Sequence, residues 1–247
     1  MTTPPLSLRE LGPPGGADDD SIRRIFRQTV VLGRSTPFEL PDLDRYEALC
    51  LGWYLGEGRR WAAVLVQSPP GEAEQVAGYV LVCPDTSVHE RWVRIPALRF
   101  AARTLVGLAS GRYRREARAF WWLRLRDGAR SWRRGIPAPM PMHVHLNLDP
   151  DVRATSAGRL LVGHADTVAT VHGLVGWFGE VNARAGHRAG ALERLGATVV
   201  HRTPNLTFSW VREEPVERLT VVRTLGQTSK VARRWATASS PTPMWAA

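Results

Sequence analysis

Two histidines at alternate positions, His143 and His145, are the side chains in this sequence best suited to acid–base chemistry. They lie in a segment, 142–148, whose residues alternate strictly between apolar and polar. This alternation predicts a strand that buries one face and presents both imidazoles, with Asn147, on the other. Because imidazole titrates near neutral pH, either ring could take a proton from an attacking nucleophile. Satisfied, partly buried histidines are the alternative interpretation.

A carboxylate and a metal site are two further candidates for chemistry. Glu180 falls at the end of another predicted strand, 174–181, where it could act as a base through a water or hold an amine. A solvated carboxylate at a strand end is the alternative. His-x-His on a strand is also a spacing found in metal sites. The third ligand would come from His164, His172 or Glu180. No further ligand motif supports a metal, so we predict none.

The segment after the histidine strand could bind a phosphate. Asp149-Pro150-Asp151 ends the strand, because proline cannot donate to a sheet ladder. A run of small residues, 153–158, then leads into an amphipathic pattern that predicts a helix. The free N–H groups and the positive dipole end of such a helix favour an anion such as a pyrophosphate. An ordinary strand-to-helix loop is the alternative.

Helices and strands are predicted on both sides of this segment. Asp18-Asp19-Asp20 begins a helix through about residue 32, and Asp42 opens a second helix that Gly56 ends. Two β-patterned runs follow, at 61–66 and 75–83. After the phosphate turn and the strand 174–181, we expect a helix at roughly 184–195, strands at 198–202 and 206–211, and an edge strand at 219–225.

Composition limits the class of protein. A chain of 247 residues fits one large domain, or one domain with an insertion. Hydrophobic residues at 44% and charged residues at 23% are ordinary for a soluble globular protein. No apolar run reaches the roughly 18 residues of a transmembrane helix, and no secretory leader is visible. We therefore expect a cytoplasmic protein without membrane association. Cys50 and Cys83 lie in apolar patterns and are expected to be buried thiols.

Positive charge gathers in one segment. The net charge is +10, and Lys230 is the single lysine, which is typical of a GC-rich genome and weakens any argument from arginine count alone. Between the strands, the spacing predicts helices at 90–110 and 113–134. Arginines at 112–134 interleave with Trp121, Trp122 and Trp132. Such a surface could bind single-stranded nucleic acid, close over an acceptor or form a dimer contact. A solvated helix with its tryptophans packed on the core is the alternative.

The segment 148–158, LDPDVRATSAG, resembles the acyl-CoA-binding motif of the GNAT (GCN5-related N-acetyltransferase) superfamily. Arg153 and Gly158 match that motif at the right spacing, and Ser156 stands at the position of its first glycine. Asn182, followed by an amphipathic helix and Leu195-Gly196-Ala197, is similar to the family's later motif. The resemblance covers residues 142–197. Leu192 stands where the family has a tyrosine that often acts as general acid, which leaves water or a histidine to protonate the departing thiolate.

The resemblance implies an α/β fold: a mixed, splayed central sheet flanked by helices. The predicted helices before the cofactor-binding strand would be an insertion, because the family normally has a short hairpin connection there. It implies acetyl-CoA, or another acyl-CoA, as the cofactor. The cofactor-binding residues would then be Leu146, Leu148, Arg153, Ala154, Ser156, Ala157, Gly158, Arg159 and Asn182. Some family members carry the base on this same strand, which makes His143 and His145 catalytic candidates beside Glu180.

We therefore expect an N-acyltransferase that moves an acetyl group from acetyl-CoA to a primary amine by direct attack in a ternary complex. The acceptor would be a small molecule or a protein amine, and a homodimer would be common for the family. A catalytically inactive CoA-binding or partner-binding module is one alternative. A basic nucleic-acid-associated protein acting through the arginine-rich insertion is another, although no RNA-binding motif supports it.

The predicted organisation of the chain has three parts. Residues 1–17 are expected to be a disordered segment. Residues 18–225 are expected to form the GNAT-like domain, with the helical insertion at about 85–140 and the acyl-CoA-binding core at about 142–212. Residues 226–247 are expected to be a flexible tail.

Overall fold

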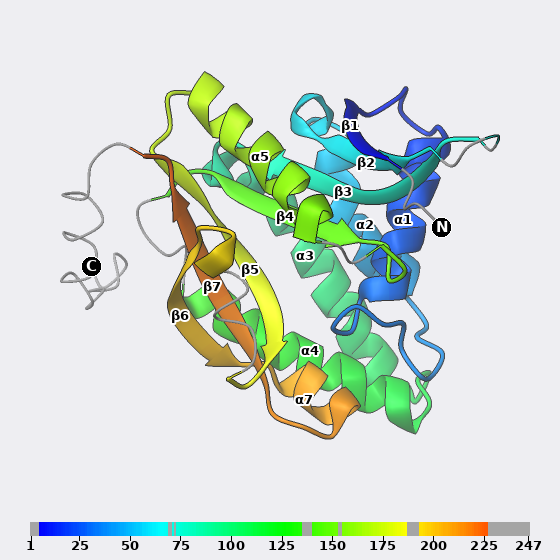
Figure 1. Ribbon diagram of the computed structural model, residues 1–247. Helices are drawn as coiled ribbons and strands as arrows, with labels where there is room; N and C mark the ends of the chain where they lie inside the picture. Colours follow the sequence, from blue (N-terminus) through cyan, green and yellow to red (C-terminus); the bar gives the residue numbers. More distant parts are fainter. Residues whose placement is uncertain are drawn as a thin grey trace.

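In a computed structural model of the chain, seven strands form one mixed sheet that carries helices on both faces (Figure 1). The structure describes residues 5–68, 71, 73–134, 140–152, 155–186 and 193–226. The strands are β1 (Leu6–Glu10), β2 (Ala63–Gln67), β3 (Gln75–Cys83), β4 (His143–Leu148), β5 (Gly176–Arg184), β6 (Thr198–Pro204) and β7 (Val216–Thr224). The helices are α1 (Ala17–Thr29), α2 (Leu43–Leu55), α3 (Thr86–Ala109), α4 (Arg115–Arg134), α5 (Thr155–Val171) and α7 (Leu206–Arg212), with a short 3-10 turn η1 (Arg59–Trp61).

The sheet has the strand order β1-β2-β3-β4-β5-β7-β6, and one neighbouring pair in it is parallel. That pair is β4 and β5, and its register is confined to His143 with Phe178 and Val144 with Gly179. Beyond these positions β5 continues to pair with β7 as far as Arg184. β4 likewise continues to pair with β3 as far as Leu148. The two central strands therefore diverge, which confirms the predicted mixed and splayed sheet.

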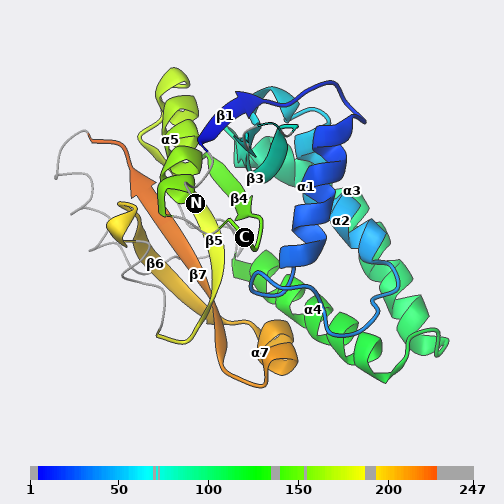
Figure 2. The same ribbon diagram turned by 45° about the vertical axis from the view of Figure 1, so that its right-hand side comes forward.

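The helices form a layer on each side of the sheet (Figure 2). α5 packs on one face, where Ala157 and Leu161 meet Met142 and Val144 in a buried cluster. α1 and α2 lie on the opposite face together with α3 and α4. The alternation along β4 explains this division, since its apolar residues face α5 and its polar residues face the other layer. The predicted strand and its two faces are confirmed.

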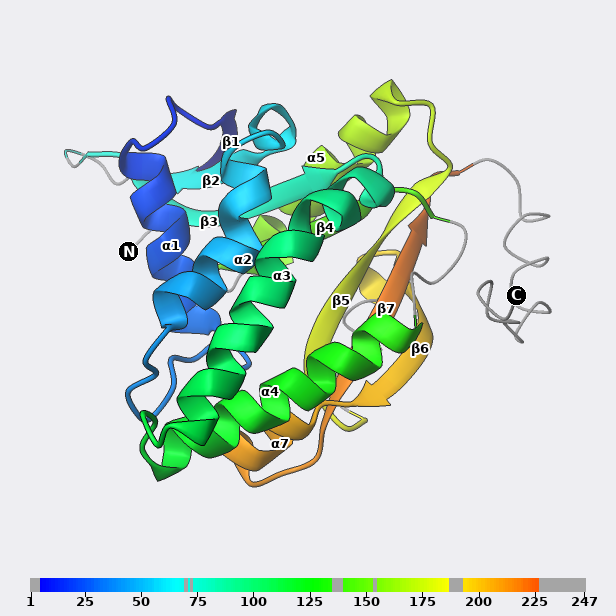
Figure 3. The ribbon, with the colours of Figure 1, turned by 180° about the vertical axis from the view of Figure 1, so that it is seen from behind.

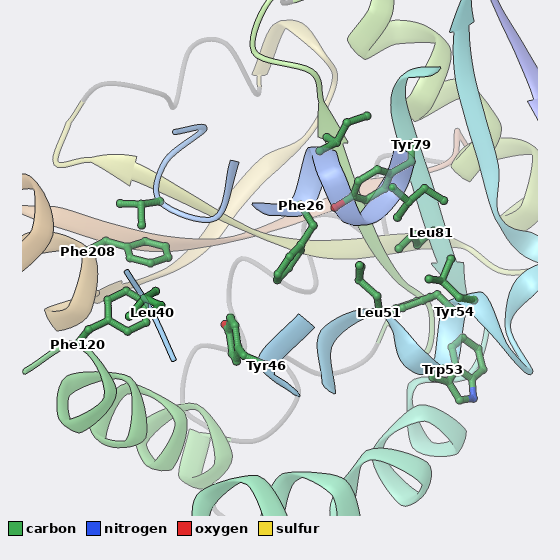
Figure 4. Packing of buried hydrophobic residues seen from close by; sticks show 14 of the residues in the cluster. Phe26, Leu40, Tyr46, Leu51, Trp53, Tyr54, Tyr79, Leu81, Phe120 and Phe208 are labelled. Carbon is green, nitrogen blue, oxygen red and sulfur yellow. The ribbon is translucent and has the colours of Figure 1, made fainter. Parts of the chain in front are cut away.

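The larger core cluster joins the sheet to α1, α2 and the inserted helices (Figure 4). It is rich in aromatic residues, among them Phe26, Tyr46, Tyr54 and Tyr79. The ring of His145 lies among three of them, with its centroid 6.5 Å from that of Phe26, 6.4 Å from Tyr54 and 5.7 Å from Tyr79. The polar face of β4 is therefore covered by packed side chains.

The insertion forms the two predicted helices, which lie across the back of the molecule (Figure 3). The carboxylate of Asp85 caps α3 by accepting a hydrogen bond of 2.9 Å from the N–H of Ser87. On α4, Trp121 is fully buried and donates to the carbonyl of Pro41 at 2.9 Å. Trp122 and Trp132 are 51% and 60% exposed. One of the three tryptophans therefore anchors the insertion, and the other two do not pack on the core.

The N-terminal prediction was wrong for residues 6–10. They form β1, which pairs antiparallel with β2 at the edge of the sheet. Leu6 and Leu8 pack against the cluster beneath α5. Arg9 fixes the segment to α1 through a bidentate pair with Asp18 at 2.7 and 2.9 Å. The proline- and glycine-rich composition suggested disorder for the whole segment. Composition does not show that a short alternating run has a strand with which to pair.

Three predictions in the C-terminal third also need correction. The strand predicted at 206–211 is the helix α7, and the predicted edge strand at 219–225 is β7, which lies inside the sheet between β5 and β6. β5 runs to Arg184, so the helix expected from residue 184 does not begin there. Residues 187–192 of that helix lie outside the described part of the chain, as does the tail from residue 227.

Tertiary contacts explain why α7 is helical despite its β-favouring residues. The side chain of Asn205 accepts from the N–H of Phe208 at 3.0 Å. The carboxylate of Asp127, on α4, accepts from the N–H groups of Leu206 and Thr207 at 3.2 and 2.9 Å. These bonds satisfy the free donors of the first turn. None of the helices described here is long and apolar enough to cross a membrane.

We predict that Asp127→Ala strongly destabilises the protein. Asp127 is 3% exposed and also accepts from the hydroxyl of Thr207 at 2.6 Å, so its removal leaves buried donors without acceptors. The free energy of unfolding, measured by urea denaturation, should fall by about 3 kcal/mol. As a control, Asp44→Ala should change it by about 0.5 kcal/mol or less, because the Asp44 side chain is 83% exposed. Equal effects would contradict the capping role of Asp127.

Candidate functional site

Where β4 and β5 diverge, β4 has an open edge. The N–H of Phe178 donates to the carbonyl of Met142 at 3.0 Å, so the even-numbered residues of β4 direct their backbone groups toward β5. The N–H of Asp149 donates to Ala77 of β3 at 2.9 Å, so the odd-numbered residues direct theirs toward β3. Leu146 and Leu148 lie beyond the last paired position and have no β5 partner in the described chain. Their backbone groups therefore line the gap, as the sequence predicts.

His145 and Glu180 stand on opposite sides of this gap. Continuing the register one step past Val144 and Gly179 would set His145 beside Glu180. The ring centroids of His143 and Phe178 lie 5.8 Å apart, which shows that the odd residues of β4 share a face with the even residues of β5. His145 and Glu180 are thus the first side chains on that face of the two diverging strands. The register, continued one step, would therefore bring two of the three catalytic candidates side by side.

His143 is held differently, because both of its ring nitrogens have partners. Nε2 is bonded to the hydroxyl of Tyr54, and Nδ1 lies 2.8 Å from Oγ1 of Thr86. The Thr86 hydroxyl donates its one proton to the carbonyl of Pro141 at 2.6 Å, so it must accept from Nδ1–H. Nε2 therefore accepts from Tyr54. The chain of donors fixes one tautomer of His143 and leaves it no lone pair for a substrate.

Burial keeps the histidines of this face neutral. It lowers the pKa of His143 to about 3, with further lowering by the neighbouring rings of His89 and His145. Burial also lowers the pKa of His145 to about 4 and that of His89 to about 4. His145 has aromatic neighbours and no hydrogen bond to a described residue. At neutral pH its imidazole therefore offers a lone pair, whereas the lone pair of His143 is already used.

The structure describes only part of the segment 149–158, the predicted phosphate-binding turn. Arg153 and Ala154 lie outside the described residues, as does Leu192 at the position of the family's tyrosine. The helix α5 begins at Thr155, so Ser156, Ala157 and Gly158 supply N–H groups of its first turn. Ala157 is buried against the sheet, and Ser156 and Arg159 are exposed. A Cβ at Gly158 would meet no atom closer than 3.9 Å.

Asn182 does not lie in a loop before a helix. It is within β5, opposite Arg218 of β7, and its side-chain oxygen accepts from Nδ2 of Asn205 at 2.8 Å. This bond ties β5 to the start of α7. Asn182 therefore caps no helix, and its contact with a cofactor stays a prediction.

The structure disfavours the metal and thiol alternatives. His164, on α5, and His172, directly after it, lie across the sheet from His143 and His145. They bond to the carbonyl and the indole N–H of Trp61 at 3.0 and 3.1 Å. In the described chain no three histidine, cysteine or acidic side chains are grouped to hold a metal. Both cysteines are free thiols, and burial raises the pKa of Cys83 to about 12.

Four residues of the site region were not found from the sequence: Tyr54, Thr86, Arg124 and Arg218. The first two hold His143, Arg218 lies beside Glu180, and Arg124 is on α4. Arg124 was noted only as one of many arginines. No local motif marks any of them, because each reaches the site from an element distant in the sequence.

Solved structures resemble the whole chain. A protein named SsHAT superposes with a TM-score of 0.56 at 23% identity, over 91% of this chain and 100% of that one. A candidate acetyltransferase from Acinetobacter baylyi ADP1 superposes with a TM-score of 0.51 at 12% identity, over 92% and 97%. A GCN5-related N-acetyltransferase from Kribbella flavida reaches 0.48 at 16% identity, over 89% and 98%. No family model and no curated protein matches the chain.

The divergent parallel pair, with an α5 that follows β4 through the phosphate turn, is the arrangement that the motif resemblance implies. The superpositions agree with it over nearly the full length. The chain has the fold of the GNAT superfamily. At these identities the likeness defines the architecture, and the chemistry has to be argued from the residues of this chain.

We predict acid destabilisation from the buried histidines. In the unfolded chain a histidine binds a proton near pH 6.5, whereas folded His89, His143 and His145 stay neutral to about pH 4 or below. Their stabilising effect is therefore complete above about pH 6.5 and is lost as the pH falls. Each should contribute a slope of about 1.4 kcal/mol per pH unit. In His89→Leu, urea denaturation between pH 6.5 and 5 should show that the free energy of unfolding changes less steeply with pH, by about 1.4 kcal/mol per pH unit. An unchanged slope would contradict the assignment of a neutral His89.

Proposed function

We propose that the protein is an acyl-CoA-dependent N-acyltransferase that moves an acetyl group to a primary amine by direct attack in a ternary complex. The observation that carries this proposal is the open edge of β4, with His145 and Glu180 flanking it. An extended chain with amide groups needs unpaired backbone donors and acceptors in a row, and Leu146 and Leu148 offer them. The first turn of α5 offers N–H groups to a pyrophosphate. The residues present therefore fit acyl-CoA.

Bound acetyl-CoA would supply an activated thioester, and side chains and backbone groups of this chain would position the reactants and accept the proton. The N–H of Leu146, the first unpaired donor of β4, suits the carbonyl oxygen on which negative charge develops. Glu180 would hold the amine beside the gap, which converts a bimolecular encounter into a positioned one. The neutral ring of His145 would accept the proton that the amine loses when its nitrogen bonds to the carbonyl carbon. CoA would depart as a thiolate with the electrons of the broken carbon–sulfur bond, and water would protonate its sulfur.

The inactive-module alternative shares the fold and differs in turnover. It predicts acetyl-CoA binding without any acetylated product. The nucleic-acid alternative depends on the arginines of the segment 112–134, and predicts affinity that falls steeply with salt. Part of that charge is already used within the protein, since Arg112 pairs with Asp42 and Arg124 bonds to Tyr46.

We predict that acetyl-CoA and CoA bind with low-micromolar dissociation constants in calorimetric titration, a typical range for enzyme substrates. Gly158→Asp should abolish binding, because it puts a negative charge at the first turn of α5. Gly158→Ala is the matched control and should keep affinity within about threefold, since a Cβ fits there. Loss of binding in both variants would point to misfolding, and no binding by the wild type at millimolar cofactor would refute the proposal.

A second prediction tests the separate roles of His145 and Glu180. With an accepted amine, His145→Gln should lower kcat by about 100-fold and leave the KM for acetyl-CoA nearly unchanged, as expected for loss of a proton acceptor. Glu180→Gln should mainly raise the KM for the amine. His172→Gln, on the far side of the sheet, is the control and should change kcat by no more than about twofold. An unaffected kcat in His145→Gln would remove His145 from the mechanism.

A further inference from the structure

Two arginines, Arg218 on β7 and Arg124 on α4, lie near one another on the face of the sheet that α4 covers. Arg218 of β7 stands opposite Asn182 of β5 and Thr203 of β6, so its side chain is on the sheet face that α4 covers. The Arg218 side chain is only 10% exposed, and its Nη1 donates to Oγ of Ser131 on α4. The same Nη1 lies 3.6 Å from a carboxylate oxygen of Glu180. Arg218 therefore reaches from the sheet to the residue that flanks the gap.

Arg124 is the second of these arginines. Its Nη2 donates to the hydroxyl of Tyr46, and its guanidinium lies over the rings of Tyr46 and Phe208, 5.1 and 5.7 Å from their centroids. Its Nη1 is buried and has no hydrogen-bond partner among the described residues. An arginine cannot relieve this by losing its proton, so a buried guanidinium nitrogen without an acceptor indicates a site for one.

The carboxylates nearby do not fully satisfy the two guanidinium groups. Asp127 is committed to the N–H groups and hydroxyl at the start of α7. Glu180 is 3.6 Å from Arg218, beyond hydrogen-bond distance, and its side chain is 36% exposed. Burial lowers the pKa of Arg218, and the positive charge of Arg124 lowers it further. Two like charges buried together in this way favour an added anion.

A cavity lies beside Arg218, and neither Arg124 nor Glu180 is among its lining residues. Its volume is about 360 Å³. It is lined by Asp127, Arg130, Ser131, Thr203, Pro204 and Arg218. Since Arg218 lines the cavity and also approaches Glu180, the cavity adjoins the site at which the amine is expected to bind.

We propose that Arg218, with the positive charge of Arg124 behind it, binds a carboxylate carried by the acyl acceptor, so that the acceptor is an amino acid-like zwitterion. This inference rests on the proposed function and names its substrate class. The ammonium group of such an acceptor pairs with Glu180 while its carboxylate pairs with Arg218. When the ligand binds, Arg218 pairs with its carboxylate and Glu180 pairs with its ammonium group, in place of the ion pair between the two side chains. Neither charge is left unpaired. A doubly charged phosphate fits less well, because Asp127 and Glu180 lie at the same site.

The test uses two matched series of amines with acetyl-CoA and the full-length protein. One series runs from 3-aminopropanoate to 6-aminohexanoate, and the other holds the alkylamines of the same lengths. At the best length, kcat/KM for the amino acid should exceed that for the alkylamine by about 100-fold. In Arg218→Gln the preference should collapse to within about fivefold, mainly through loss of activity with the amino acid. The control Arg126→Gln, an exposed arginine on α4, should keep the full preference.

A binding measurement tests this inference independently of whether the protein transfers an acetyl group. The melting temperature of the wild type should rise with added amino acid of the best length, and that of Arg218→Gln should not. If acetyl-CoA does not bind, the proposed function fails, and the melting shift alone decides the inference. Equal rates for the two series, no melting shift in the wild type, or a preference that survives Arg218→Gln would each overturn it. A preference for aminoalkyl phosphates over carboxylates would overturn the choice of carboxylate.

Discussion

The early end of pairing between β4 and β5 is the constraint on which the rest of the site depends. The two strands share only the positions at His143–Phe178 and Val144–Gly179, although each continues to pair with its outer neighbour. A sheet that loses its ladder in the middle leaves backbone donors and acceptors without partners, which is costly unless solvent or a ligand supplies them. The gap therefore creates a binding edge and fixes which side chains stand beside it.

The helical insertion gives this gap its particular chemistry. Its first residue, Thr86, fixes the tautomer of His143, and α4 carries Arg124, Asp127 and Ser131 to the opposite side of the site. Together with α1 and α2 it covers the polar face of β4, which removes water from the histidines and lowers their pKa values. A basic helical segment that reads as a charged surface in the sequence thus also forms an inner wall of the site.

Local signals predicted a good part of this structure. The alternation in 142–148, the helix starts near Asp18 and Asp42 and the two inserted helices all came from periodicity and turn chemistry, which are carried by neighbouring residues. Within the described chain the expected side-chain caps are absent at both of those helix starts, and Gly16 is the N-cap residue of α1. The failures were β1, α7 and the interior position of β7, and each is decided by contacts across the fold, such as the bonds from Asp127 to the start of α7. In the site, the sequence pointed to the histidines and Glu180 by their chemistry. The difference between His143 and His145 depends on Tyr54 and Thr86, which bond both ring nitrogens of His143 and which no motif marks.

Amide hydrogen exchange along β4 tests the central claim most directly. In the free protein the N–H groups of Leu146 and Leu148 should exchange rapidly, whereas those of His145 and Asn147, which face β3, should be protected. Adding acetyl-CoA should slow exchange at Leu146 and Leu148 and leave the other two unchanged. Protection of all four amides in the free protein would mean that β4 has no open edge, and an unchanged pattern with acetyl-CoA would mean that the cofactor does not bind along it.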